Sequence, residues 1–146
     1  MVNKKLYQAL ADFQQEVPII YKTTQGHNYT YADLPAIFGI INPLLKKHGL
    51  GFTQLVTVIN PTDKAIPVIE TRLFHVEAGE SIESTTIIPQ NVSLMKMNDF
   101  QVLGSAITYL RRYALSSMLG LVTDKDNDAS GEQTTSSFKK EVNDDF

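Results

Sequence analysis

The sequence contains no cysteine. It can therefore form no disulfide, no thiolate nucleophile and no zinc site with cysteine ligands. No apolar run approaches the roughly 18 residues of a membrane span, and the N-terminal stretch MVNKKLYQALADF lacks the apolar region and cleavage site of a secretory signal. We therefore expect a protein of the cytoplasm.

Motifs of catalysis are also absent from the sequence. We find no phosphate-binding GxxxxGK[ST], no dinucleotide-binding GxGxxG, no HExxH and no GxSxG. The acidic run from Asp124 resembles the opening of a calcium loop, but Ala129 stands where glycine is required and Thr135 where glutamate is required. We expect no enzyme, no metal site and no cofactor.

Charge is unevenly distributed along the 146 residues. The net charge of -3 argues against a nucleic-acid partner only if it is spread evenly. Residues 1–122 carry ten lysines and arginines against nine acidic residues, whereas residues 123–146 carry three against seven and are rich in Ser, Thr, Asp and Asn. We predict one folded core domain at 1–122 and a disordered acidic tail at 123–146. The nearly neutral core neither excludes nor indicates a polyanion partner.

The N-terminal third of the chain has the apolar spacing of helices. A helix is predicted over residues 4–17 and is ended by the proline that follows. A second helix is predicted to begin at Thr30 or Asp33 and to end before Gly49, with lysines in its last turn. Pro43 is expected to kink this helix rather than end it.

The middle of the chain changes to the composition of strands. Segments 52–59, 66–77 and 81–88 are rich in β-branched residues and are separated by short turn sequences. They predict a three-stranded antiparallel meander. With the N-terminal helices and the helix described next, the predicted fold class is α+β, with helices covering one face of the sheet.

The clearest helical period lies at residues 101–121. Its core-facing stripe is predicted to consist of Ala106, Ile107, Leu110, Ala114, Met118 and Leu121. Its polar face is predicted to consist of Ser105, Thr108, Tyr109, Arg112 and Ser116. Arg111 falls at the border, so its stem can lie along apolar surface while its guanidinium reaches outward.

Two arginines and two tyrosines in this helix are the main functional signal. Arg111 and Arg112 offer phosphate contacts, and Tyr109 and Tyr113 offer rings on which bases can stack, a combination suited to single-stranded nucleic acid. The alternative is structural: Tyr113 lies in the core and Arg111 pairs with a carboxylate.

Beyond these properties, QVLGSAITYLRRYALSSMLGLVTDKDND, starting at Gln101, resembles the conserved motif of the Erf family (essential recombination function) of phage single-strand annealing proteins. Upstream, YADL from Tyr31, Pro43 and KHGL from Lys47 are similar to the family's N-terminal motif, and the strands add TRL from Thr71 and the Gly79-Glu80 turn. The likeness covers about residues 5–128, and the long C-terminal extension of larger members is absent.

The resemblance implies ATP-independent annealing of complementary DNA strands in phage recombination, in the cytoplasm of a bacterial host. It also implies homo-oligomers, with a ring as one form, and a βββα core similar to that of the eukaryotic ring-forming annealing proteins. Gly104 and Ser105 match the motif and serve either DNA or helix packing. The predicted DNA contacts are Arg111, Arg112, Tyr109, Lys96, Arg72 and Lys47, of which the last two also fit ordinary surface positions.

The acidic tail supports a rival function. Its end, with Asp144, Asp145 and Phe146, resembles the acidic, phenylalanine-ended tips of bacterial single-strand-binding proteins, which dock on basic pockets of repair partners. The rival is a phage protein that engages a host repair factor or single-strand-binding protein through these residues and binds no DNA itself. A third hypothesis is that the acidic tail competes with DNA for the basic surface that carries Arg111 and Arg112.

Overall fold

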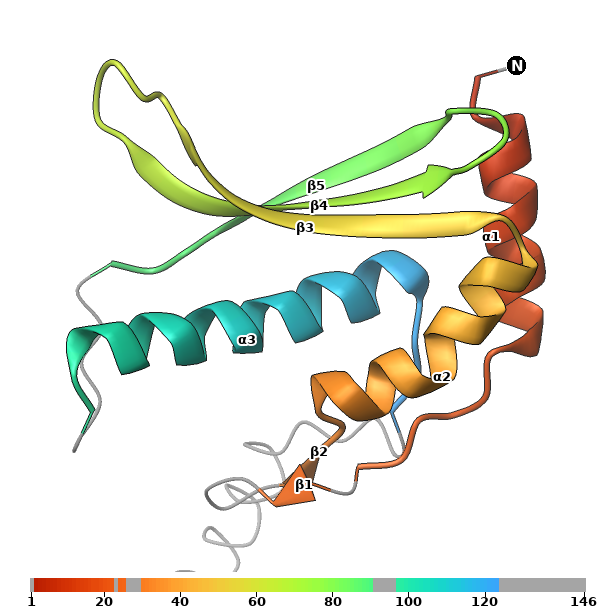
Figure 1. The fold of residues 1–146 in the computed structure, drawn as a ribbon, viewed down its shortest axis with the longest axis horizontal. Coiled ribbons are helices and arrows are strands. Elements are labelled where there is room, and N and C mark those ends of the chain that lie inside the picture. Colours follow the sequence, from red (N-terminus) through yellow and green to blue (C-terminus); the bar gives the residue numbers. More distant parts are fainter. Residues whose placement is uncertain (1, 23, 26–29, 91–96, 124–146) are drawn as a thin grey trace, which may run out of the picture.

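Three helices and a three-stranded sheet form the body of the protein in the computed structural model, which describes residues 2–22, 24–25, 30–90 and 97–123. In chain order the elements are α1 (Lys4–Glu16), β1 (Thr24–Gln25), β2 (Thr30–Tyr31), α2 (Leu34–Lys47), β3 (Leu50–Ile59), β4 (Ile66–His75), β5 (Ser81–Ile87) and α3 (Asp99–Leu119). Figure 1 shows α3 running along one face of the sheet, with α1 and α2 at one end. The predicted α+β class is confirmed.

The sheet is the antiparallel meander that the sequence predicts, in the order β3-β4-β5. All ten residues of β3 pair with β4, from Leu50 opposite His75 to Ile59 opposite Ile66. The β4–β5 turn contains Gly79 at a positive φ of 68°, a conformation that other residues rarely adopt. A two-residue pair, β1 with β2, was not predicted.

Both N-terminal helices begin at a side-chain oxygen. Asp33 caps α2 by accepting a 2.9 Å hydrogen bond from the amide of Ala36, and α2 continues through Pro43 as expected. At the start of α1, Glu80 from the β4–β5 turn accepts a 2.9 Å hydrogen bond from the amide of Leu6. The Gly79-Glu80 turn therefore connects α1 to the sheet. A carboxylate at a helix N-terminus accepts a hydrogen bond from a free amide and also interacts favourably with the helix dipole.

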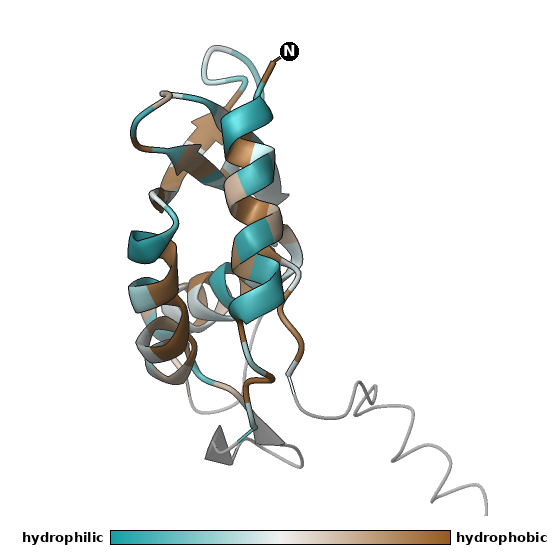
Figure 2. Ribbon diagram, turned by 90° about the vertical axis from the view of Figure 1, so that its right-hand side faces the viewer, coloured by the Kyte–Doolittle hydropathy of each residue, from teal (hydrophilic) through white to brown (hydrophobic). Residues whose placement is uncertain are grey.

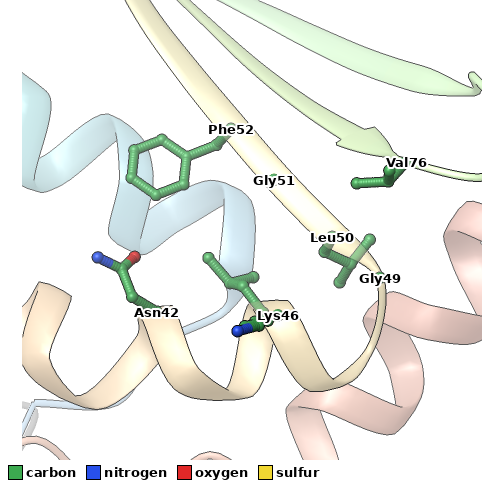
Figure 3. A pocket seen from close by; sticks show the side chains of 8 residues that line it. Asn42, Lys46, Gly49, Leu50, Gly51, Phe52 and Val76 are labelled. Carbon is green, nitrogen blue, oxygen red and sulfur yellow. The ribbon is translucent and has the colours of Figure 1, made fainter.

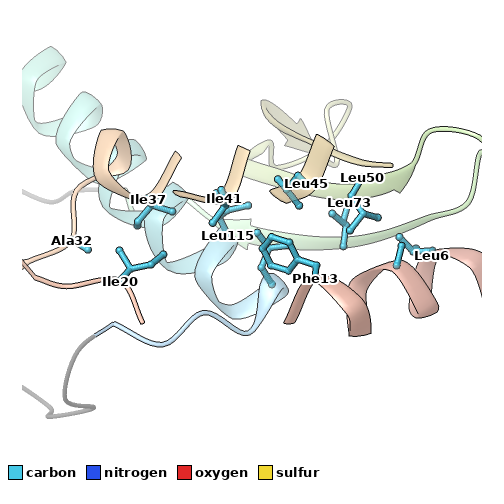
Figure 4. Close-up of a cluster of buried hydrophobic side chains, with 12 residues drawn as sticks. Leu6, Phe13, Ile20, Ala32, Ile37, Ile41, Leu45, Leu50, Leu73 and Leu115 are labelled. Carbon is cyan, nitrogen blue, oxygen red and sulfur yellow. The ribbon is translucent and has the colours of Figure 1, made fainter. Parts of the chain in front are cut away.

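The hydrophobic core lies where the three helices meet one end of the sheet (Figure 4). Helix α1 presents alternating hydrophilic and hydrophobic bands (Figure 2) and buries its apolar side. The buried cluster comprises Leu6, Ala9, Phe13, Ile20, Ala32, Ile37, Ile41, Leu45, Leu50, Leu73, Leu115 and Leu119. Only β3 and β4 contribute to it from the sheet, each through one residue near the end that adjoins α1 and α2.

Helix α3 is closed at both ends. Asn98 and Gln101 form a capping box, and Gly120 ends the helix at a φ of 68°. The predicted core stripe is confirmed only in part: Met118 and Leu121 pack against the core cluster, but all six of its residues are only partly buried. The buried residues of α3 are Val102, Arg112, Leu115 and Leu119. Helix α3 packs mainly on β4 and β5, which turns its most buried line away from the predicted stripe.

The far half of β3 remains open. Leu55, Val56 and Val58 are exposed, and so is Ile87 of β5. No strand among the described elements pairs with the outer edge of β3 or of β5. Helix α3 covers one face of the sheet, and Figure 1 shows no described helix on the other face.

Candidate nucleic-acid interface

Arg111 lies against the sheet through Gln54 of β3. The Gln54 amide nitrogen donates to the carbonyl oxygen of Arg111 at 3.0 Å and to the hydroxyl of Thr71 at 3.1 Å. The Gln54 carbonyl oxygen accepts a longer contact of 3.4 Å from Nε of Arg111. Thr71 is fully buried and lies opposite Gln54 in the β3–β4 register. Gln54 thus links a buried strand position to both the backbone and the side chain of Arg111.

The Arg111 guanidinium also lies over an aromatic ring. Its Cζ atom is 5.8 Å from the ring centre of Phe38 in α2, within the range of a cation–π interaction. The Phe38 ring in turn packs at 5.6 Å, tilted by 55°, against that of Phe52 in β3. Arg111 is partly buried, as its border position predicted, and no carboxylate of the described residues lies within ion-pair distance of it. The predicted alternative, a paired Arg111, is not found in this part of the chain.

Arg112 has a different environment, and its predicted place on the exposed polar face is wrong. Its side chain is only 9% exposed. The guanidinium is 5.4 Å from the ring centres of both Tyr109 and Tyr113, which are 4.6 Å from each other. A helical period alone cannot reveal this burial, because it depends on which side of α3 packs on β4 and β5.

The two tyrosines remain about half exposed, Tyr109 at 48% and Tyr113 at 52%. Tyr113 is therefore no core residue, which removes the packing alternative for it. Because the rings lie four residues apart on one helix, they form a continuous aromatic surface beside Arg112. Exposed rings of this kind can stack on bases.

Arg72 is neutralised by acidic neighbours. Its guanidinium lies 2.6 Å from Glu83 and 3.4 Å from Glu70. It follows Thr71 in β4, so side-chain alternation places it on the face of the sheet opposite to α3. Arg72 and Arg111 consequently do not belong to one surface.

Lys47 is also paired. Its ammonium contacts both carboxylate oxygens of Glu16, at 2.8 Å and 2.9 Å, which joins the ends of α1 and α2. This hydrogen bond lowers the pKa of the Glu16 carboxyl below its ordinary value, against a smaller opposing effect of desolvation. Lys96, Asp144, Asp145 and Phe146 lie outside the described residues.

Three residues near Arg111 were not predicted: Gln54, Phe38 and Phe52. Gln54 carried a usable signal, since it is the only long polar side chain in the strand LGFTQLVTVI and shares the strand phase of Phe52 and Val56. A polar residue on a covered strand face needs a partner. The aromatic contacts carried no such signal, because Phe38 and Phe52 come from different elements.

An open pocket adjoins this site. It has a volume of about 570 Å³ and lies between the second half of α2 and the start of β3 (Figure 3). Its lining residues are Asn42, Leu45, Lys46, Gly49, Leu50, Gly51, Phe52 and Val76. The described residues include no cluster of His, Asp or Glu able to hold a metal ion, and none of their helices is long and apolar enough to cross a membrane.

A partly buried arginine with no carboxylate of the described residues beside it is suited to binding a phosphate, and the exposed rings of Tyr109 and Tyr113 on the same helix are suited to stacking on bases. Comparison with protein families agrees with the sequence motifs. The model of the ERF superfamily matches residues 6–145, nearly the whole chain, so the chain belongs to this family. The search of curated proteins gave no match, and neither did the search of solved structures.

Proposed function

We propose that this protein binds single-stranded DNA and anneals complementary strands without ATP during phage recombination, in the cytoplasm of the bacterial host. The observation that carries the proposal is Arg111, a positioned and partly buried cation with no carboxylate beside it among the described residues. Membership of the ERF superfamily supports the same function.

The environment of Arg111 suits a phosphate. A cation that has lost part of its hydration gains from an anion that replaces the missing water. Nε of Arg111 donates a hydrogen bond to Gln54, and the guanidinium lies over the ring of Phe38. No hydrogen bond from the described residues involves the two terminal nitrogens, which suit a bidentate contact, the geometry in which arginine binds phosphate oxygens best.

The aromatic pair supplies a second surface on the same helix, beside Arg112 and on the other side of α3 from Arg111. Tyr109 and Tyr113 each expose about half of their surface there. Stacking on such rings is tolerant of sequence, because every base has a π-face. Annealing then needs no catalytic group, since base pairing itself supplies the driving force.

Strand β3 supports assembly into homo-oligomers. It carries no charged residue over ten positions, has no proline, and pairs along only one edge among the described elements. Proteins normally protect such an edge with charges, prolines or bulges, so an unprotected one indicates pairing with another chain. Repetition of one phosphate site per subunit would give a nearly neutral protein high affinity for DNA.

The central test is Arg111→Ala, with Arg72→Ala as the matched control. Hydrogen bonds to a charged group contribute roughly 1.5–3 kcal/mol, so affinity for a labelled oligothymidylate in a fluorescence anisotropy titration should fall at least about tenfold. Arg72→Ala should leave affinity within about twofold, because its charge is already neutralised. Annealing of complementary oligonucleotides without ATP should follow the same order.

Arg112→Ala belongs in this test as a second comparison. Because Arg112 is buried, it should lower thermal stability, which Arg111→Ala should change little. Wild-type annealing by the Arg111→Ala variant would remove Arg111 from the site. A wild-type protein that binds single strands but does not anneal them would contradict the proposed function.

Assembly is tested by Val56→Lys combined with Val58→Lys, which places charges on the exposed half of β3. Light scattering should show a smaller assembly than that of the wild type, with circular dichroism unchanged. Lysines at two exposed positions of α1, Gln8→Lys and Gln15→Lys, are the control and should leave the mass unchanged. Equal mass in both double variants would argue against the β3 edge as the interface.

Deletion of Val142 to Phe146 distinguishes the rival function of the tail from the proposed annealing function. Under the rival, capture of a host repair factor or single-strand-binding protein is lost and no DNA binding exists to be measured. Under the proposal, annealing survives the deletion. Removal of residues 123–146 tests competition between tail and DNA, because affinity at low salt should then rise; unchanged affinity would contradict competition.

A further inference from the structure

The pocket between α2 and β3 lies beside the pair of aromatic rings that reaches Arg111. Phe52 lines the pocket, and its ring packs at 5.6 Å against Phe38. Phe38 is the ring over which the Arg111 guanidinium lies at 5.8 Å. A ligand held at Arg111 is therefore separated from the pocket only by two aromatic side chains in contact with each other.

The pocket has an apolar wall and two polar side chains, those of Asn42 and Lys46. Leu45, Leu50 and Phe52 supply the apolar surface, and the exposed amide of Asn42 offers both a hydrogen-bond donor and an acceptor. Figure 3 shows Asn42 and Lys46 on the α2 side and Phe52 on the β3 side. A volume of about 570 Å³ is within the range of pockets that hold small planar ligands.

Lys46 distinguishes this pocket from an ordinary surface hollow. Its ammonium makes no ion pair with the described residues, whereas the adjacent Lys47 is held by both oxygens of Glu16. The site thus has a cation at Arg111, aromatic rings and an apolar pocket next, and a second cation at Lys46. This order matches a strand of nucleic acid, in which each base branches from a sugar that lies between two phosphates.

We propose that the α2–β3 pocket holds one nucleobase of the single strand whose phosphate is bound at Arg111, with Lys46 contacting a neighbouring phosphate. The inference rests on the proposed DNA binding and adds a base subsite to it. Phe52 provides the stacking surface, and Asn42 hydrogen-bonds to the edge of the base. In each subunit one base is then held by the protein until the complementary strand displaces it.

The test compares two oligonucleotides of equal length, one of thymidines and one in which every nucleotide is abasic. Both have the same phosphates, so only the first can fill the pocket. Phe52→Leu should weaken binding of the thymidine strand about fivefold and leave binding of the abasic strand unchanged. Asn42→Ala, at an exposed position that the fold does not need, should act in the same sense by about twofold.

Lys46→Ala and Lys47→Ala form a matched pair at neighbouring positions. Lys46→Ala should weaken binding of both strands by about threefold and lower the slope of log affinity against log salt by about one. Lys47→Ala should change neither, because Glu16 already neutralises it. Equal effects of the two lysines would overturn the assignment of Lys46.

The outcomes separate the pocket from the proposed function. If Phe52→Leu and Asn42→Ala weaken both strands equally, or weaken neither, the base subsite is wrong. Arg111→Ala decides the function independently, since it should weaken both strands whether or not a base enters the pocket. If Arg111→Ala lowers the affinity for both strands, and the pocket variants do not distinguish the thymidine strand from the abasic one, DNA binding at Arg111 is supported and the base subsite is wrong.

Discussion

One arginine lies on each side of the sheet, Arg111 on helix α3 and Arg72 on strand β4, and the surroundings of the two arginines are opposite. On the face covered by α3, Arg111 meets the neutral amide of Gln54 and the ring of Phe38. On the other face, Arg72 lies between Glu70 and Glu83. The first has no carboxylate within ion-pair distance among the described residues, and the second has two.

The difference shows that the neighbours of an arginine, and not its exposure, decide whether its charge is balanced within the described residues. Arg72 is the more exposed of the two, yet its charge is balanced within the protein. Arg111 is partly buried, and no carboxylate of the residues that the structure describes balances its charge. The neutral Gln54 is the decisive neighbour, because a carboxylate at that position would compete with phosphate.

The largest expected effect comes from giving Arg111 an acidic neighbour, so that its surroundings resemble those of Arg72. Gln54→Glu places a carboxylate beside Arg111, so affinity for single-stranded DNA should fall about tenfold. The control is Thr53→Glu, one residue earlier in β3 and opposite Arg72, which adds the same charge where the arginine is already neutralised. Anisotropy titrations should show less than a twofold change for the control. Equal losses would mean that net charge, and not the partner of Arg111, controls binding.

The converse change removes the acidic neighbours of Arg72, so that its surroundings resemble those of Arg111. Glu70→Gln combined with Glu83→Gln frees Arg72, so affinity at low salt should rise about threefold. The salt dependence of binding should steepen at the same time. Asp12→Asn with Glu77→Gln removes as much charge away from Arg72 and is the control. A similar gain in both double variants would contradict a specific contribution of Arg72.

A smaller effect is expected from the aromatic ring beneath Arg111. Phe38→Leu keeps an apolar side chain but removes the cation–π contact, which contributes about 0.5–1 kcal/mol at exposed sites. Affinity should fall about threefold, while the Arg72 side of the sheet is untouched. Phe100→Leu, at an exposed ring at the start of α3, is the control. A larger loss with Phe100→Leu would place the DNA at that end of α3 instead.

The smallest effect concerns Lys47, which Glu16 neutralises as Glu83 neutralises Arg72. Since the pKa of Glu16 is lowered in the folded protein, its contribution to stability is present above the unfolded-state pKa. It is lost as the pH falls through the lowered folded-state value. Glu16→Gln should therefore flatten the acid limb of a plot of melting temperature against pH. Lys47→Met should flatten it less, because His48 also lies 3.3 Å from Glu16 and helps to lower its pKa. An unchanged limb in both variants would show that the pair contributes nothing.

Local sequence patterns predicted most of the elements. The two helical segments, the three strands and the long helix were located within a few residues, because each has its own apolar period and its own start and stop signals. Asp33 and Gly49 mark the limits of α2 as expected. The pair β1 and β2 was missed, since two-residue strands have no period.

The candidate site was predicted only in part. The border position of Arg111 and the exposure of Tyr109 follow from the helical period and are confirmed. The burial of Arg112 and the shifted core line of α3 do not follow from it, because they depend on which side of the helix meets β4 and β5. The DNA contacts themselves, including Lys96 outside the described residues, stay predictions.

By itself, the sequence determined the fold class, the family and the helix that carries the two arginines, since these depend on period, composition and local motifs. Tertiary structure alone decided which arginine has a carboxylate beside it among the described residues. Gln54 lies 57 residues before Arg111, and Glu83 reaches Arg72 only through the β4–β5 register. The range of ion pairs and hydrogen bonds is a few ångströms in space, so no local pattern along the chain reports them.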